Sequence, residues 1–206
     1  YQKFICHVQM RQFDKALEEA ELCLKRMEEG SFNWFKVLEL YFLLYMHSRK
    51  YTKAEEIFQR ATQHPEFSGL PPNIRETWKI SEAYLYFLEK AGMFSWEEDR
   101  YDHFRLGKFL NEIDVFSKDK QGMNIPVLLV ELLIRLVEED YDGYIDRQEA
   151  INKYRQRYLK EEETQRSNYF LMMMLQIPKA DFDREEVEKR TAETFQSLQE
   201  LSRSEE

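Results

Sequence analysis

The acidic stretch EEDYDGYIDRQE, residues 138–149, contains side chains whose types and spacing could bind a metal ion. Counted as a calcium loop, it has acidic side chains at the first, third, fifth, ninth and twelfth places and a glycine at the sixth. The candidate ligands are Asp140, Asp142, Asp146 and Glu149. Calcium binds through oxygen atoms, and a bound cation would relieve the repulsion among carboxylates crowded into so few residues.

The same stretch also fits the start of a helix that needs no metal. Asp146 and Glu149 have the spacing of a capping box, in which each side chain accepts a backbone N–H at the helix start. Gly143 suits a tight turn, because only glycine adopts a positive φ without cost. Glu138, at the first place, is longer than the aspartate that calcium loops prefer, and no second loop accompanies this one. We therefore predict a turn between two helices rather than a calcium site.

A capping pattern of this kind occurs five times in the chain. Each occurrence has an apolar residue, a capping residue and a third residue three positions beyond the cap, as in a capping box preceded by a hydrophobic staple. The occurrences are Phe13-Asp14-Leu17, Tyr51-Thr52-Glu55, Phe94-Ser95-Glu98, Ile145-Asp146-Glu149 and Phe182-Asp183-Glu186. We predict that a helix begins within about two residues of each cap, as the second helix of a hairpin.

The elements that must position these caps are helices. The chain has only six glycines and five prolines, and these fall between periodic segments, as in a mostly helical protein. About ten helical segments follow from these breaks. The fold class that we predict is all-α, with about five antiparallel helical hairpins.

Composition narrows the classes of partner. The 39 acidic against 30 basic residues, a net charge of −9, argue against nucleic acid, because its phosphates demand a positive face. The longest mostly apolar run is far too short to span a bilayer, so we expect no membrane partner.

Cys6 and Cys23 cannot form a disulfide framework, and we expect both to be buried in a cytoplasmic protein. Because the chain opens on Tyr1 in what looks like a helix, we expect it to be a piece of a longer protein.

Two segments of the first third repeat each other. The segment RQFDKALEEAELC, residues 11–23, matches RKYTKAEEIFQRA, residues 49–61. The pairs that correspond at helical spacing are Phe13 with Tyr51, Ala16 with Ala54, Ala20 with Phe58 and Cys23 with Ala61. We expect the small alanines to be buried where two helices approach closely.

The second segment and the helix before it resemble the tetratricopeptide repeat. Ala54, Phe58, Ala61 and Pro65 follow the second-helix half of that pattern, and Trp34, Val37 and Tyr41 follow the first half, with Leu38 where the family has glycine. The resemblance is clearest over residues 1–65 and divergent over 72–206. It implies one repeat domain, 1–206, in which the hairpins stack as a right-handed solenoid.

In the family, first helices of successive hairpins line a concave groove that holds a peptide or a partner helix. Carried over to this sequence, the resemblance implies a groove formed by Lys36, Glu39, Leu43, His47, Glu76, Lys79, Ala83 and Tyr86. The function that follows is a non-enzymatic scaffold module whose partner is a protein or peptide. Two alternatives stay open: a sensor or regulatory domain of a larger signalling or transcription regulator, and a calcium-binding adaptor that uses residues 138–149.

The sequence offers no constellation typical of catalysis. It has no nucleophile elbow, phosphate loop, dinucleotide fingerprint or zinc helix, so we expect no enzyme and no cofactor. Asp99 and His103 share the spacing of a ligand pair, but one pair is too few for a metal site. The basic face of Lys153, Arg157 and Lys160 is expected to be solvated. The apolar runs 127–137 and 169–177 are expected to be core.

Overall fold

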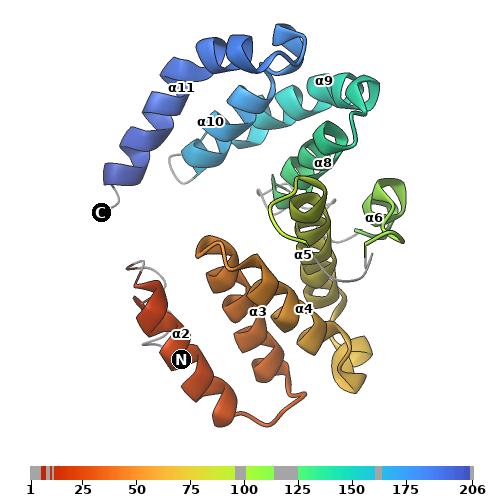
Figure 1. Cartoon of the computed structure of the whole chain (residues 1–206), viewed down its shortest axis with the longest axis vertical. Coiled ribbons are helices and arrows are strands. Elements are labelled where there is room, and N and C mark those ends of the chain that lie inside the picture. The colour runs from red at the N-terminus through yellow and green to blue at the C-terminus, as the bar shows by residue number, and fades with distance from the viewer. Residues whose placement is uncertain are drawn as a thin grey trace. The chain divides into compact units, whose positions relative to one another are not determined.

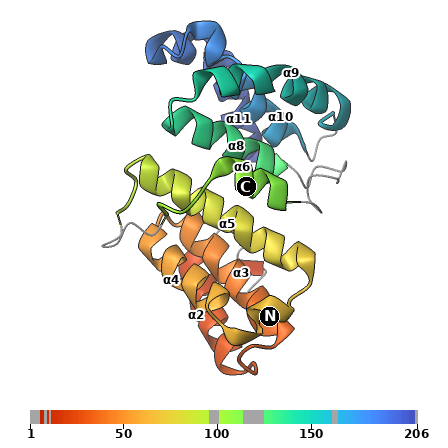
Figure 2. The same ribbon diagram turned by 90° about the vertical axis from the view of Figure 1, so that its right-hand side faces the viewer.

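The structure is a computed structural model of the whole chain, and it describes residues 6–7, 10, 12–95, 101–113, 125–160 and 164–204. These residues form helices joined by short connections, and none of them lies in a strand, which confirms the all-α prediction (Figures 1 and 2). None of the helices in these ranges is both long and apolar enough to cross a membrane. The chain divides into two compact units, Tyr1–Ile113 and Asp114–Glu206, and the single repeat domain stays a prediction.

The first unit is built on a row of helices. Its α-helices are α2 (Phe13–Lys25), α3 (Phe32–His47), α4 (Tyr51–Thr62), α5 (Pro72–Lys90) and the short α6 (Leu106–Glu112), and the 3-10 helix η1 (Pro65–Gly69) joins α4 to α5. Figure 1 shows α2, α3 and α4 side by side, with α3 in the middle. A helix with neighbours on both sides must be apolar over most of its surface, and α3 is.

Small residues allow these three helices to approach closely. Ala16 and Ala20 of α2 and Ala54 and Ala61 of α4 are completely buried, as predicted from the repeated segments. The expectation that both cysteines are buried was wrong, because Cys6 is exposed and Cys23 is only partly buried; both are free thiols.

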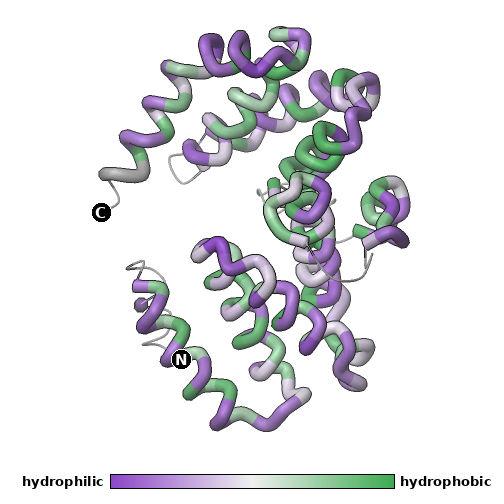
Figure 3. Tube along the Cα trace, viewed as in Figure 1, coloured by the Kyte–Doolittle hydropathy of each residue, from purple (hydrophilic) through white to green (hydrophobic). Residues whose placement is uncertain are grey.

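The second unit has its core around α8. Its elements are α8 (Ile125–Val137), α9 (Tyr141–Tyr158), α10 (Gln165–Met174), the 3-10 helix η3 (Pro178–Ala180) and α11 (Arg184–Ser204). Figure 3 shows α8 mostly in the hydrophobic colour, whereas α11 is mostly hydrophilic. Leu132, Tyr144, Ile151 and Leu171 form a fully buried cluster, which confirms that the two apolar runs supply core residues.

Buried polar groups also join the helices of the second unit. The Glu131 carboxylate on α8 is only 1% exposed, and it pairs with Arg135 at 3.2 Å and with Arg147 of α9 at 2.8 Å. The Tyr144 hydroxyl donates a hydrogen bond of 2.8 Å to the carbonyl of Met174 at the end of α10, which also accepts the Ile177 N–H at 3.2 Å. Both contacts satisfy groups that would be costly to bury alone.

One type of turn recurs at the ends of several helices. After α3, three consecutive backbone N–H groups donate to carbonyls of the last turns of that helix. Ser48 donates to Leu44, four residues back; Arg49 donates to Met46, three back; and Lys50 donates to Tyr45, five back. Residues 91–93, 138–140 and 180–182 repeat the same three bonds, and Met10 and Gln12 make the first and third of them. The middle residue has a positive φ, at Arg49, Gly92, Glu139 and Asp181. These are Schellman turns, which satisfy the last carbonyls of the helix before them.

The Schellman turns explain the outcome of the capping prediction. The helices α2 and α4 begin at Phe13 and Tyr51, within two residues of Asp14 and Thr52 as predicted. However, the N-cap positions are Gln12 and Lys50, and neither side chain caps its helix. Asp14 and Thr52 therefore lie inside the first turn, because the backbone turn already fixes where each helix begins.

The remaining caps differ from one another. Asp183 caps α11, since its Oδ1 accepts the N–H of Glu186 at 2.8 Å. The prediction for Asp146 was wrong, because it lies within α9 and Asp140 is the N-cap of that helix. The residues that follow Ser95 lie outside the described ranges.

Candidate functional site

The described part of the first unit has an open groove of about 610 Å³ between α2 and α4. In this article it is called the α2–α4 groove, and α3 forms its floor. Its lining residues are Glu21, Leu24, Lys25, Met27, Glu29, Trp34, Tyr41, Tyr45, Lys53, Glu56, Ile57 and Arg60. Leu24, Met27 and Ile57 contribute apolar side chains, so the groove combines an apolar surface with a charged rim.

Two stacked tyrosines form the centre of the floor. The rings of Tyr41 and Tyr45 lie 4.9 Å apart at an angle of 19°, and the Tyr45 hydroxyl donates to the Tyr41 hydroxyl at 3.4 Å. Burial raises the pKa of Tyr41, because the charged phenolate would be poorly solvated there, so the phenol stays neutral at ordinary pH. A partner would meet two ring surfaces and two neutral hydroxyls that can donate or accept a hydrogen bond.

The end of the groove near the α2–α3 connection is held by Trp34. The Arg60 guanidinium lies 5.1 Å from the centroid of the Trp34 ring, and it also pairs with Glu29 at 3.4 Å. Trp34 is almost completely buried, so it supports the floor rather than offering a free ring face. These contacts tie the end of α4 to the α2–α3 connection and fix the shape of this end of the groove.

The charges on the rim balance one another. Three carboxylates are matched by three cations in ion pairs: Lys25 with Glu21 at 3.2 Å, Lys53 with Glu56 at 2.7 Å, and Arg60 with Glu29 at 3.4 Å. These pairs are exposed, and each contributes little to folding stability. A neutral rim selects neither strongly acidic nor strongly basic partners.

The α3 residues implied by the family resemblance do not line the α2–α4 groove. Lys36, Glu39, Leu43 and His47 fall on the opposite side of α3 from Tyr41, because a helix turns about 100° per residue. Leu43 is 44% exposed and Lys36 pairs with Glu39 at 2.6 Å. The His47 ring is stacked against Phe13 at 6.0 Å.

The α5 residues implied by the resemblance are mostly covered by the chain itself. Glu76, Ala83 and Tyr86 are buried, and the Tyr86 ring is stacked on Phe104 at 4.4 Å. Lys79 pairs with Glu112 of α6 at 2.7 Å. The segment 101–113 therefore lies over part of the face where the resemblance implies a ligand.

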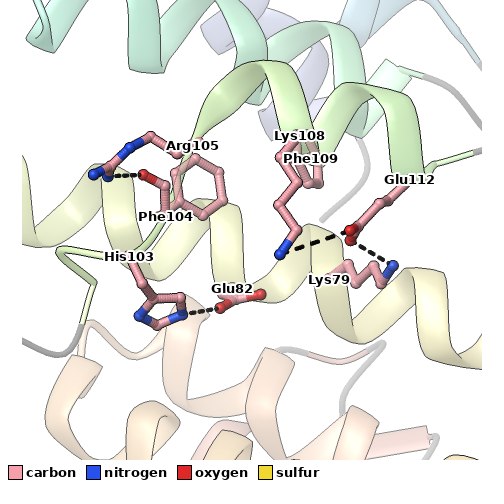
Figure 4. Close-up of a pocket in the computed structure, with 8 residues that line it drawn as sticks. All are labelled: Lys79, Glu82, His103, Phe104, Arg105, Lys108, Phe109 and Glu112. Carbon is pink, nitrogen blue, oxygen red and sulfur yellow. Dashed lines mark hydrogen bonds and ion pairs between the residues drawn. The ribbon is translucent and has the colours of Figure 1, made fainter.

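That segment and α5 enclose a second, smaller pocket of about 140 Å³, called here the α5–α6 pocket (Figure 4). Its lining residues are Lys79, Glu82, His103, Phe104, Arg105, Lys108, Phe109 and Glu112. Of the pair Asp99 and His103 singled out in the sequence, the His103 ring lies 3.3 Å from the Glu82 carboxylate, and Asp99 lies outside the described residues.

The acidic stretch 138–149 contains the α8–α9 turn and the first half of α9. Asp140 Oδ1 accepts the N–H of Gly143 at 3.1 Å, and its Oδ2 pairs with the Arg135 guanidinium. An arginine thus neutralises the carboxylate nearest the turn. Gly143 has no positive φ, so the sequence argument for this glycine was wrong. Glycine fits at this position because it has no Cβ, and a Cβ here would overlap the side chains of Arg135 and Asp140.

The other candidate ligands do not gather around a common point. Glu149 does not bond back to the backbone as predicted; it pairs with Lys153 at 2.5 Å, and this hydrogen bond lowers the pKa of Glu149. Within the described part of the chain, no group of three or more His, Cys, Asp or Glu residues could hold a metal ion, and this includes Asp142 and Asp146. The stretch is a helix–helix turn held by Arg135.

The α2–α4 groove was not predicted from the sequence. Tyr41 and Tyr45 lie four residues apart, and Trp34 lies seven residues before Tyr41, so all three share one side of a helix. Trp34 and Tyr41 were assigned to the tetratricopeptide pattern, and Tyr45 was not singled out. The available signal was the type of residue, because a tyrosine pair has two polar hydroxyls that a purely apolar core does not need.

Comparison with known proteins gives no relative from which a function could be inferred. No family model matches the chain, and neither the search of curated proteins nor the search of solved structures found a match.

Proposed function

We propose that this chain is a non-enzymatic interaction module that binds an apolar peptide segment in the α2–α4 groove. The observation that carries the proposal is the groove itself, about 610 Å³ in volume, with the Tyr41–Tyr45 pair at its centre. Aromatic residues are enriched at sites of protein recognition, because a tyrosine supplies both ring surface and a hydrogen bond with little loss of side-chain freedom.

The architecture behind this proposal is a right-handed stack of about five hairpins, like the tetratricopeptide repeat. Two observations support the stack. The same Schellman turn recurs before α4, α9 and the last helix, α11. Aromatic residues beside successive turns also touch: Tyr51 lies 6.2 Å from Phe94 in the first unit, and Tyr141 lies 4.2 Å from Phe182 in the second. Repeated contacts of one kind between neighbours are how stacked repeats are stabilised.

The chemistry of the groove defines its ligand. A balanced rim gives little long-range attraction, so affinity must come from burying apolar side chains against Leu24, Met27 and Ile57. The tyrosine hydroxyls would hydrogen-bond the peptide and fix its position. We therefore propose a peptide with apolar anchors and little net charge, in a cytoplasmic protein as the free cysteines suggest.

Peptide selection tests this function. Random displayed peptides are selected on the whole chain, and the affinity of the enriched peptides is measured by fluorescence anisotropy. We expect Tyr45→Ala to weaken binding by about tenfold, because central aromatic residues dominate interfaces. Comparison with Tyr45→Phe, which retains the ring, separates the contribution of the hydroxyl to affinity from that of the ring. Thermal unfolding of each variant checks that the groove is intact.

The matched control is Leu43→Ala, on the opposite side of the same helix. It should change the affinity less than twofold, within the error expected for a residue outside the interface. Because the rim is neutral, raising the salt concentration should also change affinity little. Peptides that lose binding on Leu43→Ala but not on Tyr45→Ala would contradict the proposal and place the ligand on the face implied by the family resemblance.

A further inference from the structure

The α5–α6 pocket has a rigid apolar floor. The rings of Phe104 and Phe109 are 6% and 5% exposed, and their centroids lie 5.8 Å apart. Phe104 is held from behind by its stack on Tyr86. At about 140 Å³, the pocket has the volume of about five water molecules, which suits one small polar group rather than a whole side chain of a large residue.

Cations outnumber carboxylates around this floor. The pocket is lined by three permanent cations, Lys79, Arg105 and Lys108, and by His103, against two carboxylates, Glu82 and Glu112. This is a local excess of positive charge on a chain with a net charge of −9. An apolar floor strengthens the attraction between the ammonium groups and an anion, because it excludes water from one side.

Glu112 shows where an anion would lie. Its carboxylate is placed between two ammonium groups, 2.7 Å from Lys79 and 3.9 Å from Lys108 (Figure 4). The hydrogen bond from Lys79 lowers the pKa of Glu112. Lys79 therefore has a close partner, whereas the contact of Lys108 with the same carboxylate is loose.

The position of Glu112 is unfavourable for its own helix. It is the last residue of α6, where the helix dipole disfavours a negative charge. Lys108 also precedes Glu112 by four residues, and this order is the weaker one for an intrahelical pair. Glu112 is 40% exposed, so its side chain can leave the pocket without unfolding α6.

From this arrangement we propose that the α5–α6 pocket binds a small oxyanion, a carboxylate or a phosphoryl group, between the ammonium groups of Lys79 and Lys108. The bound oxyanion replaces the carboxylate of Glu112, which then turns to solvent. The site is separate from the α2–α4 groove, so it stands or falls independently of the function proposed above.

A titration followed by amide NMR tests the proposal on the whole chain. Inorganic phosphate and acetate are added separately at constant ionic strength, and the backbone amides of Gly107 and Phe109 report on the pocket. We expect saturable shifts with millimolar affinity, and the comparison of the two anions distinguishes a phosphoryl group from a carboxylate. Glu112→Gln removes the competing carboxylate and should raise the affinity about fivefold, the equivalent of one surface charge pair. Lys108→Gln should lower it by a similar factor.

The chain offers a closely matched control in the second unit. Lys153 and Glu149 form an exposed pair at the same four-residue spacing, and the side chains of Lys153 and Lys108 are 73% and 72% exposed. Lys153→Gln and Glu149→Gln should leave the titration unchanged. The proposal is overturned if the Glu112→Gln variant shows no saturable amide shift with either anion. It is also overturned if Lys108→Gln and Lys153→Gln have the same effect on anion affinity. Unchanged thermal unfolding of the variants excludes loss of folding as the cause.

Discussion

Replacing Gly143 with alanine tests whether the acidic stretch is the structural turn described here. A Cβ at this position would overlap the Arg135 guanidinium and the Asp140 carboxylate, and both must move. Moving Asp140 breaks its bond to the Gly143 N–H, a helix cap with a typical contribution of about 1 kcal/mol. The Arg135–Asp140 ion pair contributes only about 0.5 kcal/mol to folding stability, because its Asp140 side chain is 43% exposed.

Two further terms complete the estimate. Displacing Arg135 weakens the hydrogen bonding of the buried Glu131 carboxylate, at a cost of about 1 kcal/mol. Alanine offsets this in part, because it is favoured over glycine within a helix by up to about 1 kcal/mol. We therefore expect Gly143→Ala to lower the free energy of unfolding by about 1.5 kcal/mol, or the midpoint by roughly 5 to 10 °C.

The assay can separate the two units. Trp34, Trp78 and Trp96 all belong to the first unit, so tryptophan fluorescence follows that unit while far-UV circular dichroism follows both. Gly143→Ala should lower the dichroism midpoint. The matched control is Gly107→Ala in α6, where a Cβ meets nothing within 4 Å and φ is not positive, so stability should stay equal or rise slightly.

A double-mutant cycle isolates the cause. In the Asp140→Ala background the carboxylate is absent, so the added Cβ of Gly143→Ala should cost much less than in the parent. The reasoning is refuted if Gly143→Ala is as stable as the parent, or if its cost is the same with and without Asp140.

Other contacts give predictions that the same unfolding assays check. Ala54→Leu should lower the free energy of unfolding by about 1–3 kcal/mol, measured by fluorescence, because Ala54 is completely buried and a larger side chain must displace its neighbours. An unchanged free energy would mean that the helices are not packed as described. Tyr144→Phe should lower the free energy of unfolding by about 1 kcal/mol, because the Met174 carbonyl loses the Tyr144 hydroxyl and keeps only the N–H of Ile177; a neutral result would contradict the hydrogen bond from Tyr144. Burial raises the pKa of Tyr144, so the contribution of Tyr144 to stability should be fully present below about pH 10 and be lost as the pH rises further. Tyr144→Phe should reduce this loss of stability at alkaline pH. An unchanged pH profile of stability in the variant would argue against the raised pKa.

Helices and their pairing could be predicted because the signals are local. Buried alanines such as Ala54 and Ala61 recur at helical spacing, and the positions of glycine and proline mark most of the breaks. The starts of α2 and α4 were also predicted, although for the wrong reason. The turns before α4 and α9 place Arg49 and Glu139 at positive φ, a conformation that sequence patterns assign to glycine or asparagine, so the true N-caps were not recognised.

The candidate sites could not be predicted to the same extent. The α2–α4 groove is lined by residues from three helices and the α2–α3 connection, and no spacing within one helix shows that Tyr41 and Ile57 line the same depression. The α5–α6 pocket joins Lys79 to Glu112, which are 33 residues apart in the sequence. Its position over α5 depends on how Tyr86 and Phe104 pack, which is a tertiary property rather than a local one.

Site-specific photo-crosslinking tests the central claim, that peptides bind in the α2–α4 groove, most directly. A photoreactive amino acid is placed at Lys53, on the rim of the groove, in one variant and at Leu43, on the opposite side of α3 from Tyr41, in another, so that Tyr41 and Tyr45 stay in place. A selected peptide should crosslink efficiently to the variant at Lys53, be competed by unlabelled peptide, and crosslink only weakly to the variant at Leu43. Equal crosslinking at both positions, or crosslinking at Leu43 alone, would contradict the account.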